Sequence, residues 1–260
     1  MMSIANPIPA ERIGLVVFDL DGTLIDSRRD LATAVNAMLG EMGRPALPDK
    51  VVAEYVGDGA GMLVRRALGD PEDEELVEQG VERFLACYRK HMLDHTFVYD
   101  GVFEALEGLR RIPSGAKAPL SSGGSTDGLK PVPFKNCERK FAVLTNKPVN
   151  PARRICEALG LSEHFFQIYG GNSFGTKKPD PEGLRVLMRE AGASPGETVM
   201  VGDSVVDVLT ARNAGTFVIG CRYGLSSHTL ETVSADIMVD APSEWLMALG
   251  SPTFERKAEG

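Results

Sequence analysis

The stretch Val17-Phe18-Asp19-Leu20-Asp21-Gly22-Thr23 decides the fold of this chain, because an apolar run ends there in two aspartates one residue apart. The run over residues 13–18 predicts a short buried strand. Asp19 then falls at the carboxyl end of that strand, where open parallel sheets bind their ligands. Two carboxylates at such an edge suit a divalent cation, and the pattern indicates phosphate chemistry.

Length and composition predict an ordinary α/β protein. The chain has 260 residues, of which 43% are hydrophobic and 25% are charged, enough for one well-filled core and a smaller second unit. Its formal net charge of -8 argues against nucleic acid as a partner, because phosphate-backbone binding depends on clustered Lys and Arg. We therefore expect a small-molecule partner, and the sequence leaves a monomer and a homodimer equally open.

Cysteine use and apolar segments bear on the cellular compartment. The four cysteines form no CxxC pair, and no secretory signal with an apolar segment precedes them. No apolar run approaches the roughly 20 residues that a membrane-spanning helix needs. We expect a cytoplasmic protein that does not associate with a membrane.

Beyond Asp19, short apolar segments alternate with helical patterns, which is typical of a doubly wound parallel sheet. The predicted strands after the first are 141–144, 167–169, 198–201, 217–219 and 237–239. The predicted helices between them are 151–159, 181–191 and 204–214, each followed by a glycine suited to a C-cap.

Two segments interrupt this alternation. Residues 27–96 show helical patterns only, at 31–42, 49–55, 61–68 and 72–93, and predict a helical cap inserted after the first strand. Residues 113–140 are rich in Pro, Ser and Gly and predict an exposed flexible insertion, emerging at the sheet edge opposite the site. The expected organisation is a core of residues 1–26 and 97–260 with a cap of residues 27–96.

Four short motifs fall where a predicted strand ends or the next helix begins, so a parallel sheet would bring them together. They are Asp19-Leu20-Asp21-Gly22-Thr23, Leu144-Thr145-Asn146, Lys178-Pro179-Asp180-Pro181, and Val201-Gly202-Asp203-Ser204 with Asp207. In this order, and with the helical insertion after the first, they resemble the haloacid dehalogenase superfamily of aspartyl-phosphate hydrolases. The resemblance covers nearly the whole chain and implies a Rossmann-like core.

The residue types suit phosphoryl transfer. An ionised carboxylate and a phosphate dianion repel each other, so attack needs a cation that neutralises charge, and oxygen ligands suit Mg²⁺. The resemblance implies that Mg²⁺ is held by the Asp19 carboxylate, the backbone carbonyl of Asp21 and the Asp203 carboxylate. Asp207, four residues after Asp203 on the same helical face, is expected to support this metal site.

The resemblance also assigns roles in catalysis. Asp19 is the expected nucleophile, and Asp21 the expected general acid and then general base. The hydroxyl of Thr145, the backbone N–H of Asn146 and the ammonium of Lys178 are expected to hold the phosphoryl oxygens. Lys178 is preferred to its neighbour Lys177 on the Lys-Pro-x-Pro spacing.

The cap is expected to contact the leaving group. The segments 55–60 and 63–68 resemble the cap of bacterial phosphoglycolate phosphatases, which implies substrate contacts from Gly57, Asp58 and Gly59. A substrate carboxylate would need a cationic partner, for which Arg66 or Arg65 is the candidate.

The resulting hypothesis is a Mg²⁺-dependent phosphatase acting on a small phosphorylated metabolite, with 2-phosphoglycolate preferred. A sugar phosphate or an amino-sugar acid phosphate stays open as the substrate, because sister enzymes share nearly the same motifs. A β-phosphoglucomutase-like phosphomutase is a second alternative, and a non-catalytic binding module a third. Dehalogenase chemistry is disfavoured because it does not need Asp21.

Overall fold

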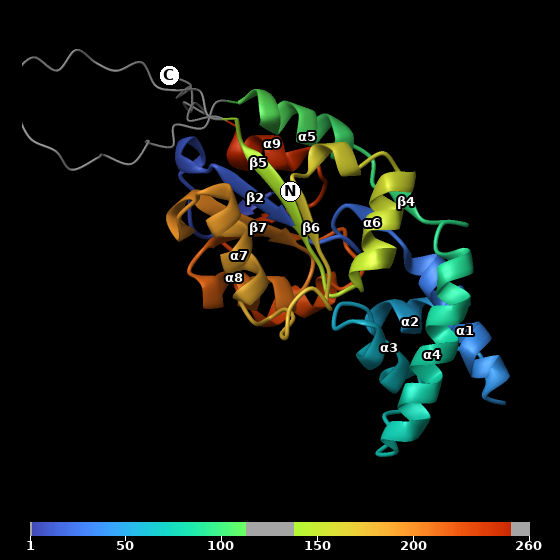
Figure 1. Cartoon of the computed structure of the whole chain (residues 1–260). Coiled ribbons are helices and arrows are strands. Elements are labelled where there is room, and N and C mark those ends of the chain that lie inside the picture. The colour runs from blue at the N-terminus through green and yellow to red at the C-terminus, as the bar shows by residue number, and fades with distance from the viewer. Residues whose placement is uncertain (1, 113–137, 251–260) are drawn as a thin grey trace, which may run out of the picture.

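The computed structural model of the chain describes residues 2–112 and 138–250. Its centre is a seven-stranded sheet with the order β1-β9-β8-β7-β2-β5-β6 (Figure 1). All neighbouring strands are parallel except β1, which pairs antiparallel with β9 at one edge. The strands are β1 (Ser3–Ile4), β2 (Leu15–Phe18), β5 (Lys140–Leu144), β6 (Gln167–Tyr169), β7 (Thr198–Gly202), β8 (Phe217–Cys221) and β9 (Ile237–Val239).

Helices cover both faces of the sheet, which confirms the predicted doubly wound architecture (Figure 1). Leu15 and Val17 pack into the layer that contains α7 and α8, whereas Val16 and Phe18 pack into the layer that contains α5, α6 and α9. Because β2 is buried on both faces, its sequence is apolar without interruption. The core helices are α5 (Val102–Arg111), α6 (Val149–Ala158), α7 (Glu182–Ala191), α8 (Val205–Ala214) and α9 (Glu244–Leu249). Short 3₁₀ turns lie at Ala10–Arg12, Ser162–His164, Pro195–Glu197 and Ser227–Thr232.

An aromatic cluster fixes the end of β2, immediately before Asp19. The ring of Phe18 lies 5.1 Å from Trp245 and 6.0 Å from Phe141, measured between ring centroids. Phe18, Phe141 and Trp245 are almost completely buried. This packing holds the strand end rigidly against α9, so the residue that follows it has a defined position.

Helices α1 to α4, hereafter the cap, lie between the short strands β3 (Ile25–Asp26) and β4 (Phe97–Val98) and extend away from the sheet (Figure 1). Strands β3 and β4 pair antiparallel, with Ile25 opposite Val98, so the chain enters and leaves the cap at one place. The cap helices are α1 (Arg28–Glu41), α2 (Asp49–Glu54), α3 (Ala60–Ala67) and α4 (Glu74–His91).

Several element boundaries differ from the predicted ones by up to three residues, for local reasons. Helix α4 begins at Glu74 rather than at residue 72 because Asp73 caps it, accepting a hydrogen bond from the Leu76 amide at 3.1 Å. Ser204 is likewise the N-cap of α8 rather than its first residue. None of the described helices is long and apolar enough to cross a membrane.

The predicted insertion at residues 113–140 ends earlier than expected. Lys140 already belongs to β5, and Arg139 is buried, with its guanidinium donating to the carbonyls of Ala10 at 2.6 Å and Ile13 at 3.1 Å. Residues 113–137, and with them the expected path of the insertion, lie outside the described residues.

Candidate active site

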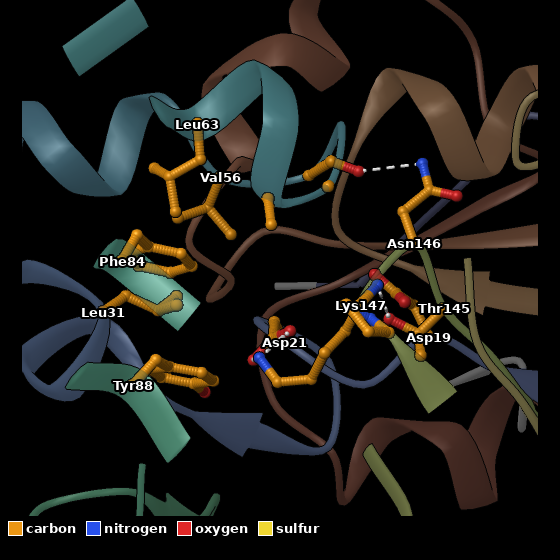
Figure 2. Close-up of a pocket in the computed structure, with 14 residues that line it drawn as sticks. Asp19, Asp21, Leu31, Val56, Leu63, Phe84, Tyr88, Thr145, Asn146 and Lys147 are labelled. Atoms are coloured by element: carbon orange, nitrogen blue, oxygen red, sulfur yellow. Dashed lines mark hydrogen bonds and ion pairs between the residues drawn. The ribbon is translucent and has the colours of Figure 1, made fainter. Parts of the chain in front are cut away.

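The carboxyl edge of the sheet gathers the motif residues singled out in the sequence. Asp19 follows β2, Thr145 follows β5 and Asp203 follows β7, and these three strands are adjacent and parallel. Lys178 reaches the same place from the segment before α7. All four side chains are buried, and Figure 2 shows Asp19 and Thr145 side by side at this edge.

Lys178 is clamped between two carboxylates. Its Nζ lies 2.8 Å from Asp19 Oδ1 and 2.6 Å from Asp207 Oδ1. Asp207 is fixed in turn by Ser204, whose backbone amide and hydroxyl donate to its Oδ2 at 3.1 and 2.6 Å. The neighbouring Lys177 is exposed and donates instead to a cap carbonyl, so the structure brings Lys178, and not Lys177, to Asp19.

Asp19, Asp203 and Asp207 form a buried acidic triad, with one carboxylate oxygen from each residue lying within 4.8 Å of the others. Burial raises the pKa of Asp19 to about 6. Burial, and then the charges of Asp207 and Asp19, raise the pKa of Asp203 well above its ordinary value. Lys178 alone does not neutralise three carboxylates, so the triad has the charge and the oxygen donors that a divalent cation requires.

Two glycines leave room for the Asp203 carboxylate. A Cβ added at Gly22 would lie 2.1 Å from Asp203 Oδ2, and one at Gly224 would lie 2.4 Å from the same atom. Gly22 also has a φ of +83°, which side chains of L residues rarely adopt. The backbone thus closes around the carboxylate, and the Ser226 amide donates to its Oδ2 at 2.9 Å.

Asp21 has a separate set of partners. Lys147 Nζ donates to both of its carboxylate oxygens, at 2.9 and 2.7 Å, and the Ser27 hydroxyl donates to Oδ1. Burial lowers the pKa of Lys147, but Asp21 and Tyr88 raise it more, so the side chain stays cationic. Sequence reasoning assigned Lys147 no role, although its place two residues after Thr145 puts it at the same sheet edge.

A pocket of about 50 Å³ lies between the cap and this edge (Figure 2). Asp19, Asp21 and Lys147 line it from the core, whereas the cap wall is mainly apolar and carries the hydroxyl of Tyr88. The residues that line the pocket are Asp19, Asp21, Leu31, Val56, Gly57, Gly59, Ala60, Leu63, Phe84, Tyr88, Thr145, Asn146, Lys147 and Pro148. The site therefore opens onto a small, mainly apolar chamber.

Core side chains hold the cap loop through three consecutive backbone carbonyls, those of residues 56–58. They accept hydrogen bonds from Ser226 Oγ at 2.8 Å, Asn146 Nδ2 at 3.1 Å and Lys177 Nζ at 2.8 Å, in that order. Gly57, with a φ of +121°, supplies a backbone shape that other residues rarely adopt. Asn146 thus joins the core to the cap through its side chain, beside the backbone role expected for it.

The cap arginines do not reach the pocket. Arg66 donates to Asp58 Oδ2 at 2.6 Å and to the Tyr55 carbonyl at 3.2 Å. Arg65 pairs with Glu74, the first residue of α4. Neither side chain lines the pocket. The structure therefore does not bring Arg66, the expected substrate contact, to the pocket that Asp19 lines. Asp58 is itself engaged by Arg66, whereas Gly57 and Gly59 do line the pocket.

Comparison with known proteins finds similar sequences and similar folds. Residues 13–215 match the model of the haloacid dehalogenase-like hydrolases. The chain is 37% identical over 238 residues to a phosphoglycolate phosphatase of Chromobacterium violaceum, covering 90% of this chain and 95% of that protein. It is 36% identical over 220 residues to one of Neisseria meningitidis serogroup A, covering 85% of each.

Solved structures show the same architecture. A crystal structure of a predicted phosphoglycolate phosphatase from Haemophilus somnus superposes with a TM-score of 0.75 at 27% identity, covering 91% of this chain and 97% of that one. A putative phosphoglycolate phosphatase from Lactobacillus delbrueckii gives a TM-score of 0.76 at 24% identity, which bears on the fold alone. The similarity therefore extends over the sheet and the cap together.

Proposed function

This chain belongs to the haloacid dehalogenase-like hydrolase family, and from that membership we propose that it hydrolyses 2-phosphoglycolate to glycolate and phosphate through a phosphoaspartate at Asp19. The relatives at 36–37% identity bear the name of that activity and are covered over most of their length. The geometry supports the proposal because two carboxylates meet at the edge of the sheet with different partners.

In the first step, an oxygen of the Asp19 carboxylate attacks phosphorus, and the bond from phosphorus to the ester oxygen breaks. Lys178, 2.8 Å from Asp19 Oδ1, stabilises the charge on the transferring phosphoryl group. We expect the hydroxyl of Thr145, a buried residue, to hold a second phosphoryl oxygen. Asp21, when protonated, delivers its proton to the leaving oxygen.

In the second step, water attacks phosphorus and transfers a proton to Asp21. The bond between phosphorus and Asp19 breaks, which regenerates the carboxylate and releases inorganic phosphate. Asp21 suits both steps because Lys147 and Ser27 fix its carboxylate separately from the pairing of Asp19 with Lys178. This division between the two aspartates carries the proposal.

The acidic triad fits Mg²⁺, because its donors are hard oxygen atoms and its charge is only partly neutralised. Asp19 and Asp203 would hold the ion with the backbone carbonyl of Asp21, and Asp207 would support them. When bound, Mg²⁺ neutralises the repulsion between the carboxylate and the phosphate dianion.

The test is phosphate release from a panel of phosphomonoesters that includes 2-phosphoglycolate, hexose phosphates and nucleotides, with Mg²⁺ and with a chelator. We expect Mg²⁺-dependent release with the highest kcat/KM for 2-phosphoglycolate. Preference for hexose phosphates would retain the mechanism and refute the substrate. No release from any ester in the panel would refute the proposed function.

A further inference from the structure

Lys147 and Tyr88 form an unassigned pair at the floor of the pocket. We propose that the Lys147 ammonium and the Tyr88 hydroxyl recognise a carboxylate on the leaving group, and so select phosphate esters of small hydroxy acids. This inference rests on the proposed function, and it transfers the role expected of a cap arginine to a lysine of the core.

The first observation is the distribution of charge around the pocket. Lys147 is the only cationic side chain among the described residues that line it, and its side chain is only 5% exposed. Leu31, Val56 and Phe84 supply the facing wall, as Figure 2 shows. A charge in such surroundings attracts an opposite charge more strongly than it would in water. An anionic group entering the pocket therefore meets one cationic partner, which it would share with Asp21.

The second observation is an unused hydrogen-bond donor, the O–H group of Tyr88. Lys147 donates two hydrogen bonds to Asp21, and its ammonium also interacts with the Tyr88 hydroxyl. The O–H donor of Tyr88 has no acceptor within the described part of the chain, although the residue is only 2% exposed. Buried hydroxyls nearly always have a partner. The Tyr88 ring lies 4.9 Å from Lys147 Nζ, so the ammonium and the unused O–H donor are in one place.

The third observation is the short distance between Lys147 and Asp21, the expected general acid. Lys147 Nζ is 2.7 Å from a carboxylate oxygen of Asp21, the residue placed to protonate the leaving oxygen. In 2-phosphoglycolate a single methylene joins that oxygen to the carboxylate. When the leaving oxygen lies at Asp21, the carboxylate therefore falls within reach of Lys147 and Tyr88.

Because Arg66 is paired with Asp58 and Arg65 with Glu74, the cap offers no competing cation to the described pocket. The small pocket volume of about 50 Å³ also favours a leaving group of few atoms. In this proposal, selectivity for the leaving group depends on Lys147, the residue that follows the Thr145-Asn146 motif.

The test compares 2-phosphoglycolate with ethyl phosphate, which keeps the ester oxygen and its methylene and has a methyl group in place of the carboxylate. Lys147→Met also removes the partner of Asp21, which affects both esters, so the ratio of their kcat/KM values is the informative quantity. We expect the ratio to fall by about 10- to 100-fold, mainly through the KM for 2-phosphoglycolate, as for the loss of a hydrogen bond to a charged group. Tyr88→Phe keeps the ring and should lower the same ratio by about 3- to 10-fold.

Lys140→Met is the matched control, because this exposed lysine lies at the opposite end of β5 and donates to the Ala191 carbonyl. It should leave the ratio unchanged. An equal loss for both esters in Lys147→Met would overturn the proposal and leave the lysine a positioning residue for Asp21. If Lys147→Met does not fold, Tyr88→Phe decides, and an unchanged ratio there refutes the proposal. No phosphate release from either ester by the unaltered protein would refute the proposed function, and this inference with it.

Discussion

Replacing Lys178 with methionine is the most direct test of the site. The substitution keeps an unbranched side chain of similar length and removes the ammonium that lies 2.8 Å from Asp19 and 2.6 Å from Asp207. The side chain of Lys178 is 2% exposed, so water cannot replace the lost cation. The carboxylates of Asp19, Asp203 and Asp207 would then face each other without a cationic side chain between them.

The magnitude follows from that burial. Removing one partner of a buried ion pair costs about 3–5 kcal/mol of folding free energy. For a chain of this size each kcal/mol corresponds to about 2–4 °C, so the Tm should fall by roughly 6–20 °C. Mg²⁺ should recover part of this loss, because a cation held by the acidic triad opposes the same repulsion. Loss of one preorganised electrostatic group should also lower kcat by about 100- to 1000-fold.

Thermal unfolding with and without Mg²⁺, together with steady-state kinetics, measures both effects. Lys50→Met is the control, because this exposed lysine of α2 has no hydrogen bond or ion pair within the described part of the chain and should change stability by no more than about 0.5 kcal/mol. If Lys178→Met kept its Tm within about 2 °C and its kcat within about threefold of the unaltered protein, the role assigned to the ion pairs of Lys178 with Asp19 and Asp207 would be refuted.

Three further predictions address the nucleophile, the metal and the backbone. Asp19→Asn should abolish turnover while leaving the circular dichroism spectrum unchanged, and substantial retained turnover would contradict a covalent intermediate. Because burial raises the pKa of Asp19 to about 6 and that of Asp203 well above its ordinary value, these groups must lose protons when a metal binds. The apparent Mg²⁺ affinity, measured by calorimetry, should therefore rise with pH between about 5 and 7, and a flat profile would oppose this. Gly224→Ala should inactivate the protein because its Cβ would lie 2.2 Å from Asp203 Cβ, whereas Gly40→Ala, at an exposed helical position with nothing within 4 Å, should raise the free energy of unfolding by about 0.5–1 kcal/mol.

The layout of the sheet could be predicted from sequence because its strands are buried on both faces. Residues such as Leu15, Val16 and Val17 are apolar without interruption, and turn residues follow each such run. Asp19 and Asp203 could be placed together because parallel strands end at one edge. In these cases local pattern and global fold point to the same answer.

Side-chain partners across the molecule could not be predicted in the same way. Asp21 and Lys147 are 126 residues apart, and only the folded sheet shows that they pair. Tyr88 lies on a buried helix face of α4, and periodicity does not reveal which part of that face meets the pocket. Arg66 was a reasonable candidate for a substrate contact, but its pairing with Asp58 depends on how the loop before α3 turns.

Core side chains hold the cap loop by hydrogen bonds to the backbone carbonyls of residues 56–58, and this bears on how substrate preference can change in evolution. Every amino acid carries a peptide carbonyl, so this contact is indifferent to the identity of the loop side chains. A lineage can exchange those side chains for others while the wall of the chamber keeps its position, provided that Gly57 retains its φ of +121°. The lining of the chamber can therefore change under selection for a new leaving group, while the hydrogen bonds that hold it beside Asp19 and Asp21 stay the same.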